Sequence, residues 1–181
     1  QNQLIMVGTP GKTLFATLPN APLRCLWGGD NRLFAVSGSK FFEVFGDGTN
    51  HLIGDVGNAS TPAQIFTSVQ VLPGGPNWQF IISGAAGYSY NGVALTKVVD
   101  AVAGAYFDGY FVAVTPNSNQ FRLSALLDAS TWPGLTVAAK EGAPDRLMMI
   151  LADHEELWLF GQKTTEVWYN SGAQPVPVQR I

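Results

Sequence analysis

The fold is decided by one stretch, Leu157-Trp-Leu-Phe-Gly-Gln-Lys-Thr-Thr-Glu-Val-Trp-Tyr169. It predicts two short strands joined by a polar turn, because each half is rich in aromatic and β-branched residues, which favour a pleated, half-buried surface. Gly161 lies in the predicted turn, where a positive φ would cost little. A single hairpin of this length is only marginally stable in water. Its apolar faces therefore need partners elsewhere in the chain.

Weaker copies of this pattern occur upstream, at Arg32–Phe45, Trp78–Tyr90 and Tyr110–Leu123. As equivalent strand positions we take Leu33, Phe80, Phe111 and Leu157. Their spacings are 47, 31 and 46 residues, and two of these lie near the ~40–50-residue period of propeller blades. The short middle interval indicates either a shortened blade or a copy aligned out of register.

We therefore expect an all-β fold, a β-propeller-like repeat of antiparallel hairpins or blades. Residues 1–181 are expected to form a single β-propeller segment of a larger propeller, excised from a longer chain, with approximate blades at 22–66, 67–100, 101–150 and 151–181. Further alternating strands are expected at Leu4–Leu18 and His51–Val56. A helix competes for residues 143–152, but a buried strand over Leu147–Leu151 fits the repeat better.

Six aromatic residues within these runs are candidates for the structural core of the blades: Phe34, Phe80, Phe111, Trp132, Trp158 and Trp168. Trp158 and Trp168 both lie in strands of alternating pattern. We expect both side chains to pack in the core or between blades.

Composition limits the possible functions. Charged residues make up 13% of the chain, against about 25% in ordinary soluble domains, which fits either a secreted β-protein with a polar surface or burial against other subunits. The net charge is −3 and the basic residues are scattered, so extensive direct binding to nucleic acid is disfavoured. Cys25 is the only cysteine, which excludes an intrachain disulfide and a cysteine-based zinc site. No apolar run approaches the ~20 residues that a membrane span needs.

Candidate chemistry is sparse. The cluster Asp153-His-Glu-Glu156 lacks the second histidine of a zinc-protease helix, and a solvated turn is the better interpretation. Asp128-Ala-Ser-Thr-Trp132 approximates the Asp-box of sialidase-type propellers, but its spacing and glycine position differ. We expect Asp128 to accept backbone N–H bonds in a turn and Trp132 to pack between blades. The residues predict no catalytic, cofactor-binding or metal-binding site.

Three ordered segments carry a family resemblance: Asn119–Trp132, Ala138–Asp145 and Glu156–Gly172. Together with Gly29–Lys40 they resemble the packaged-DNA stabilisation proteins (tail accessory factors or tail hubs) of short-tailed bacteriophages and prophages. The resemblance covers most of the chain, from about Thr9 onward. It implies a non-catalytic virion protein of the tail or head-closure complex, without a cofactor, that helps retain packaged DNA and forms a platform for tail assembly.

The same resemblance implies the partners. They are further copies in a homo-oligomeric ring, portal or adaptor proteins, other tail proteins, and double-stranded DNA passing through the channel without sequence-specific contacts. The protein would reside in the virion tail, and in the host cytoplasm during assembly. Two alternatives remain: a carbohydrate-binding or glycoside-hydrolysing β-propeller, and a general protein-interaction propeller.

Overall fold

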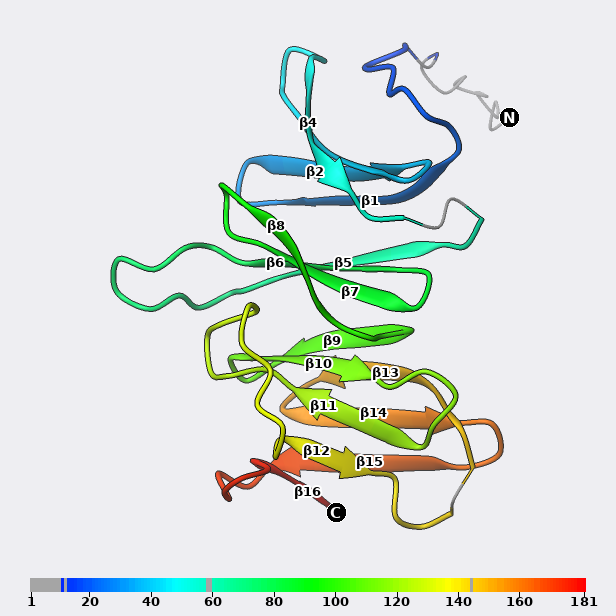
Figure 1. Cartoon of the computed structure of the whole chain (residues 1–181), viewed down its shortest axis with the longest axis vertical. Helices are drawn as coiled ribbons and strands as arrows, with labels where there is room; N and C mark the ends of the chain where they lie inside the picture. The colour runs from blue at the N-terminus through cyan, green and yellow to red at the C-terminus, as the bar shows by residue number, and fades with distance from the viewer. Residues whose placement is uncertain (1–10, 12, 58–59, 144) are drawn as a thin grey trace, which may run out of the picture.

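The computed structural model describes residues 11, 13–57, 60–143 and 145–181. In these residues, sixteen strands form four antiparallel sheets of four strands each, and within every sheet the strands lie in chain order. The four sheets follow one another as blades along the molecule (Figure 1). The predicted all-β propeller fold is thereby confirmed.

The strands of each blade are as follows. The first blade holds β1 (Leu23–Gly29), β2 (Arg32–Ser37), β3 (Lys40–Val44) and β4 (Asn50–Asp55). The second holds β5 (Ala63–Thr67), β6 (Gln79–Ser83), β7 (Ala86–Tyr90) and β8 (Leu95–Val99). The third holds β9 (Ala103–Phe107), β10 (Tyr110–Val114), β11 (Gln120–Leu123) and β12 (Val137–Ala139). The fourth holds β13 (Leu147–Asp153), β14 (Glu156–Gly161), β15 (Thr165–Asn170) and β16 (Val178–Arg180).

The four predicted hairpins are the central strand pairs of the blades, β2–β3, β6–β7, β10–β11 and β14–β15. The segment for which a helix competed is the strand β13, and His51–Val56 corresponds to β4. Residues 13–18 form no strand, whereas 4–10 and 12 lie outside the described residues. The first two strands of three blades are joined by two-residue turns with positive φ at both positions: Asp30–Asn31, Asp108–Gly109 and His154–Glu155. Such turns match the twist of antiparallel strands.

The short middle interval in the repeat has both of the expected causes, a shortened blade and a copy aligned out of register. Only three residues separate β8 from β9, and the turn between β9 and β10 has two residues. The interval between the second strands of the second and third blades is therefore shorter than the other two intervals. Phe80 was also aligned one residue out of register. It faces the following blade and contacts Phe111 across the interface, whereas Leu157 faces the preceding blade. A shift of one residue exchanges the two faces of a strand.

The blade limits differ from the expected ones in two places. Ala63–Thr67 pairs with Gln79–Ser83 and so belongs to the second blade, although residues 63–66 were expected in the first. Likewise, Leu147 begins the first strand of the fourth blade, although 147–150 were expected in the third. Each of these strands pairs with the strand that follows it in the chain. The spacing of the hairpins alone does not show this pairing.

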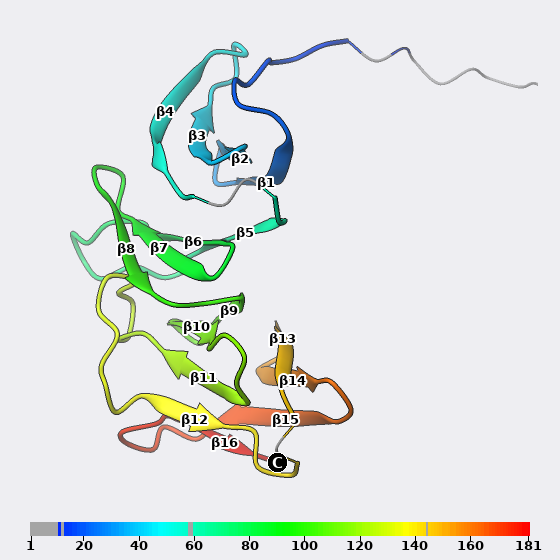
Figure 2. The ribbon, with the colours of Figure 1, turned by 45° about the vertical axis from the view of Figure 1, so that its right-hand side comes forward.

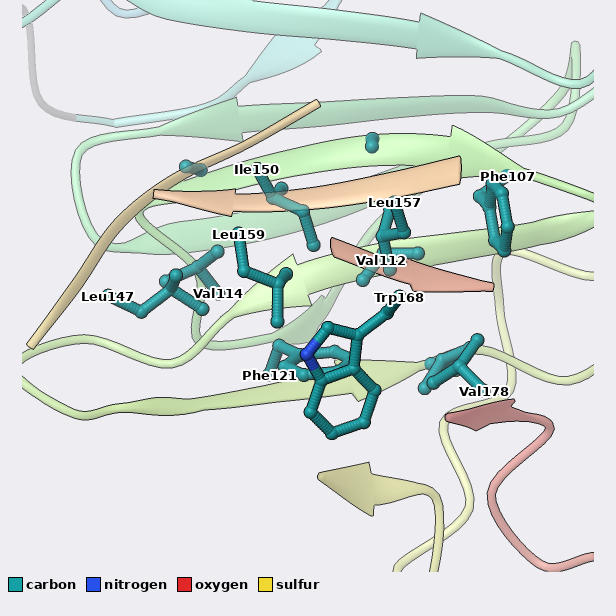
Figure 3. Packing of buried hydrophobic residues seen from close by; sticks show 13 residues of the cluster. Phe107, Val112, Val114, Phe121, Leu147, Ile150, Leu157, Leu159, Trp168 and Val178 are labelled. Atoms are coloured by element: carbon teal, nitrogen blue, oxygen red, sulfur yellow. The ribbon is translucent and has the colours of Figure 1, made fainter. Parts of the chain in front are cut away.

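The core lies between the blades. One apolar cluster joins the first and second blades, another the second and third, and the largest joins the third and fourth. Figure 3 shows this last cluster, where the rings of Trp168 and Phe121 form a T-shaped pair with 5.3 Å between their centroids. The first strands lie next to one another, since β1 contacts β5, β5 contacts β9 and β9 contacts β13 (Figure 2). The first and fourth blades lie at opposite ends of the row.

Candidate functional site: a polar lock between the third and fourth blades

A buried lysine connects the third blade to the β14–β15 hairpin of the fourth. Lys140 directly follows β12, and its side chain is fully buried. Its ammonium group is paired with the Asp145 carboxylate and donates a hydrogen bond to the Thr164 hydroxyl. Burying a charge is costly unless it is paired and hydrogen-bonded. Both conditions hold for Lys140.

Asp145 organises the turn between β14 and β15. Its Oδ2 accepts the backbone N–H groups of Lys163 at 2.7 Å and Thr164 at 3.2 Å, and its Oδ1 accepts the Thr164 hydroxyl at 2.7 Å. The Lys140 hydrogen bond, followed by those from Lys163 and Thr164, holds the pKa of the Asp145 carboxyl well below its ordinary value. The carboxylate therefore stays ionised throughout the neutral and mildly acidic range.

Gly161 has a role that differs from the one expected. It is the last residue of β14, and it is not among the glycines with positive φ. A Cβ atom there would overlap the Asp145 carboxylate and would lie 2.8 Å from Cε of Lys140. Glycine is required because the ion pair passes against the backbone, not because the turn needs a left-handed residue.

A second carboxylate extends the arrangement. Glu166 accepts the backbone N–H groups of Glu141 at 3.1 Å and Gly142 at 2.6 Å, and the indole N–H of Trp168 at 3.0 Å. Burial is the largest influence on its pKa and acts to raise it. The three hydrogen bonds and the nearby charge of Arg180 outweigh burial together, so the pKa of Glu166 is lowered.

We call Lys140, Asp145, Thr164 and Glu166 the polar lock. Its groups come from the segment after the third blade and from the β14–β15 hairpin, and their hydrogen bonds are made to one another, to nearby backbone and to the Trp168 indole. Such an arrangement fixes two chain segments relative to each other. Two of the segments that carried the family resemblance, Ala138–Asp145 and Glu156–Gly172, meet in it. Sequence reasoning did not pair them, although a Lys and an Asp five residues apart in a charge-poor chain were a usable signal.

The six core candidates are distributed over different interfaces. Phe34 lies fully buried between the first and second blades. Phe80 lies between the second and third, 5.8 Å from Phe111 and 5.1 Å from the partly buried Trp132, centroid to centroid. Trp168 is buried between the third and fourth. Trp158 is only partly buried and stacks on Phe160 at 6.4 Å, on the face that points away from the third blade.

The other candidate motifs are turns. Asp128 accepts the backbone N–H of Ser130 at 2.7 Å, and the Trp132 indole donates to the Ala129 carbonyl at 2.9 Å. His154 is exposed and donates from Nδ1 to the Asp153 carboxylate at 2.7 Å, which raises its pKa. In the described part of the chain, no group of three or more His, Cys, Asp or Glu residues could hold a metal ion.

One groove of about 610 Å³ lies along the first strands of all four blades. Its lining is mainly apolar and includes Trp27, Ile65, Tyr106 and Met149. The lining residues include no carboxylate or imidazole, and their titratable side chains are Cys25 and Tyr106. Among the residues that the structure covers, no helix is long and apolar enough to cross a membrane.

Two solved structures with a similar fold are computational designs. The Ika4 protein matches with a TM-score of 0.58 and 14% identity, over 87% of this chain and 98% of that one. The Ika8 protein matches with a TM-score of 0.56 and 12% identity, over 86% of this chain and 48% of that one. At these identities the likeness concerns the fold alone. No curated protein sequence matches.

A protein-family model matches residues 2–181, and it is the model of the phage stabilisation proteins, described as bacteriophage P22 Gp10, β-propeller. The match includes both segments of the polar lock and all four blades, and it confirms the family resemblance of the sequence. The chain therefore belongs to the family of bacteriophage P22 Gp10, the β-propeller tail proteins that stabilise packaged DNA.

Proposed function

We propose that this chain is a structural part of the phage tail or head-closure complex, where it helps to retain packaged DNA and provides a platform for later tail proteins. The family match over residues 2–181 carries this proposal. In this role the protein forms a homo-oligomeric ring that contacts portal or adaptor proteins and other tail proteins, and DNA passes through the channel without sequence-specific contacts.

The mechanism is mechanical and needs no catalytic residue. A protein that resists the outward pressure of packaged DNA must keep its blades in register under load. The buried Lys140–Asp145 pair and the Glu166 hydrogen bonds support such rigidity at the junction of the third and fourth blades. Satisfied buried polar groups hold a specific geometry, because each displaced group would lose its partners in a medium of low dielectric constant.

The charge distribution also supports the proposal. The net charge is −3, and the ten Lys and Arg residues do not cluster in the sequence. A surface without a basic stripe does not hold phosphates tightly, because phosphate binding depends on clustered Lys and Arg side chains. DNA can then leave the head without being retained at the channel wall.

Disruption of the gene in the phage or prophage that encodes this chain tests the proposal. We expect heads to package DNA but to lose it, so that the DNase-protected DNA per head falls, and wild-type protein supplied in trans should restore it. Electron microscopy of the same particles should show heads without completed tails. Heads that keep their DNA and carry complete tails after disruption would contradict the proposal.

Two lysine variants then test the part played by the polar lock. We expect Lys140→Met to restore DNA retention less well than the wild type, because it leaves Asp145 without its cation. Lys97→Met is the matched control, since Lys97 is exposed and pairs only with Asp100 within its own blade. If both variants restore DNA retention equally at equal levels of folded protein, the polar lock is not needed for DNA retention.

A further inference from the structure

The exposed apolar side chains in the connections between strands lie on one face of the molecule. Neighbouring strands of each antiparallel sheet run in opposite directions, so the connection from the first to the second strand and that from the third to the fourth lie at the same end of the sheet. We call the face formed by these connections of the four blades the loop face. Its β5–β6 loop (68–78) projects on the left of Figure 1, whereas the β6–β7 and β14–β15 turns of the opposite face lie on the right.

Every exposed large apolar side chain that the described connections contain belongs to the loop face. Val93 in the β7–β8 turn is 90% exposed, Val69 in the β5–β6 loop 85%, and Leu135 in the β11–β12 loop 76%. The other members of the set are Phe45, Val71, Leu72 and Leu126. Single exposed apolar residues are common on protein surfaces, but apolar exposure gathered on one face marks an interaction site.

Most of this exposure belongs to the second blade, which packs against a neighbouring blade on each side. Val69, Val71, Leu72 and Val93 all lie in its two connections on the loop face. No charged side chain accompanies them, since positions 56 to 96 contain no Asp, Glu, Lys, Arg or His. The apolar character of this part of the loop face is therefore set by the loops themselves and not by an uncovered strand.

The β5–β6 loop is held in shape by its own hydrogen bonds. At its base, the Ser68 N–H donates to the Trp78 carbonyl at 2.9 Å, and the Trp78 N–H donates to the Ser68 hydroxyl at 3.0 Å. At its tip, the Gly75 N–H donates to the Leu72 carbonyl at 2.7 Å. A preformed loop loses little conformational freedom when a partner binds, so its apolar side chains contribute more of their burial to affinity.

The charged residues of the loop face are mainly acidic. Its connections contain no Lys or Arg, and besides His154, which pairs with Asp153, their charged residues are Asp30, Asp47, Asp108, Asp128 and Glu155. The connections of the opposite face contain both signs of charge. Nucleic acids and anionic membranes are bound through clustered Lys and Arg. A face with acidic and apolar groups and without these cations is suited instead to a protein.

We propose that the loop face docks another protein of the same virion, one that presents an apolar surface bordered by Lys or Arg side chains. The apolar loop residues form the buried centre of this interface and the acidic residues its polar rim. Complementary charge then fixes the orientation of the partner. The inference rests on the proposed function, because it takes the partner from the tail or head-closure complex. It adds the face of the chain that is used and the chemistry of the surface that binds there.

Site-specific photo-crosslinking in assembled phage particles tests the identity of the partner. p-Benzoylphenylalanine in place of Leu72 or Val93 should form a covalent product with a virion protein other than this chain. Ala85 is the matched control position, since it is exposed in the β6–β7 turn of the same blade on the opposite face, and it should not form that product. Products with DNA, products only with a second copy of this chain, no product from particles that contain the chain, or the same product from all three positions would overturn the proposal.

Two variants that differ only in the sign of the new charge test the chemistry of the partner. Leu72→Lys should lower the number of chains per purified particle about tenfold, as expected for one important interface residue, with quantitative mass spectrometry as the measurement. Leu72→Asp should lower it clearly less, because a basic rim accepts a carboxylate. Ala85→Lys is the control for an added cation and should assemble like the wild type. Normal assembly of Leu72→Lys, or an equal or larger loss for Leu72→Asp, overturns the proposal; circular dichroism shows beforehand that each variant is folded.

Vesicles of phosphatidylcholine and phosphatidylglycerol distinguish a lipid surface from a protein partner. The wild-type chain should not sediment with them, and sedimentation that Leu72→Asp reduces would assign the loop face to a membrane and overturn the proposal. Failure of this proposal is distinct from failure of the proposed function. If disruption of the gene causes loss of DNA but Leu72→Lys assembles normally, the docking surface is refuted and the proposed function stands.

Discussion

Two tryptophans on one hairpin provide a sharp test of the fold, because Trp158 and Trp168 point to opposite faces of the fourth blade. Trp168 is 3% exposed, packs on Phe121, and donates its indole N–H to Glu166 at 3.0 Å. Trp158 is partly buried, stacks on Phe160, and donates to Glu156 at 3.1 Å. Replacement of each by alanine should therefore have very different effects on stability.

For Trp168→Ala we expect a loss of about 3–5 kcal/mol in the free energy of unfolding. A buried tryptophan removes roughly 200 Å² from water, which at about 25 cal/mol per Å² corresponds to about 5 kcal/mol, and measured Trp→Ala losses fall in the range of about 3–5 kcal/mol. At about 2–4 °C per kcal/mol for a chain of this size, Tm should fall by roughly 10 °C. For Trp158→Ala, which loses only partial burial, we expect a loss on the order of 1 kcal/mol.

Urea denaturation followed by circular dichroism measures both losses, and it should be done at a concentration where light scattering shows single chains. This condition matters because contacts between chains would add to the measured stability. Equal losses for the two variants, or a larger loss for Trp158→Ala, would refute the assignment of faces in the fourth blade. Equal losses would instead agree with the expectation from the sequence that both tryptophans pack in the core or between blades.

Two further predictions concern the polar lock. The pKa values of Asp145 and Glu166 are lowered on folding, so their contribution to stability is complete above the ordinary carboxyl pKa of about 4 and is lost as the pH falls through and below it. Tm should therefore decline below about pH 4–5, and Asp145→Asn should lower Tm at pH 7 and flatten this decline. If the variant shows the same acid decline as the wild type, Asp145 is not its source. Gly161→Ala should lower Tm clearly, because its Cβ would meet the Lys140–Asp145 pair, whereas Gly134→Ala, with open space around the added Cβ, should change it little; equal thermal shifts for the two variants would show that the pair is not tightly seated.

Much of the fold could be predicted from the sequence because it is local. Each hairpin combines alternating apolar residues with a turn, and the pattern at Leu157–Tyr169 marks its strands to within one or two residues of β14 and β15. The strand over Leu147–Leu151 was favoured for the same reason. The register of Phe80 was wrong, because in an apolar run such as Phe80-Ile-Ile nothing local shows which side chains face which blade.

The polar lock was less accessible to sequence reasoning. Lys140, Asp145 and Thr164 are separated by loops, and their meeting depends on how the fourth blade packs on the third. Gly161 illustrates the difference, since its sequence context predicted a turn glycine, whereas the structure shows a close approach by an ion pair. Only the spatial arrangement reveals that constraint.

The sequence by itself determined the hairpin repeat, the all-β class and the family, because strand alternation, turn residues and ordered motifs are properties of short segments. The tertiary structure alone decided which side of each strand is buried, since that depends on the neighbouring blade. It brought Lys140, Asp145 and Glu166 into one buried junction. It also placed Trp168 against the third blade and turned Trp158, a similar residue on the same hairpin, to the opposite face of the sheet.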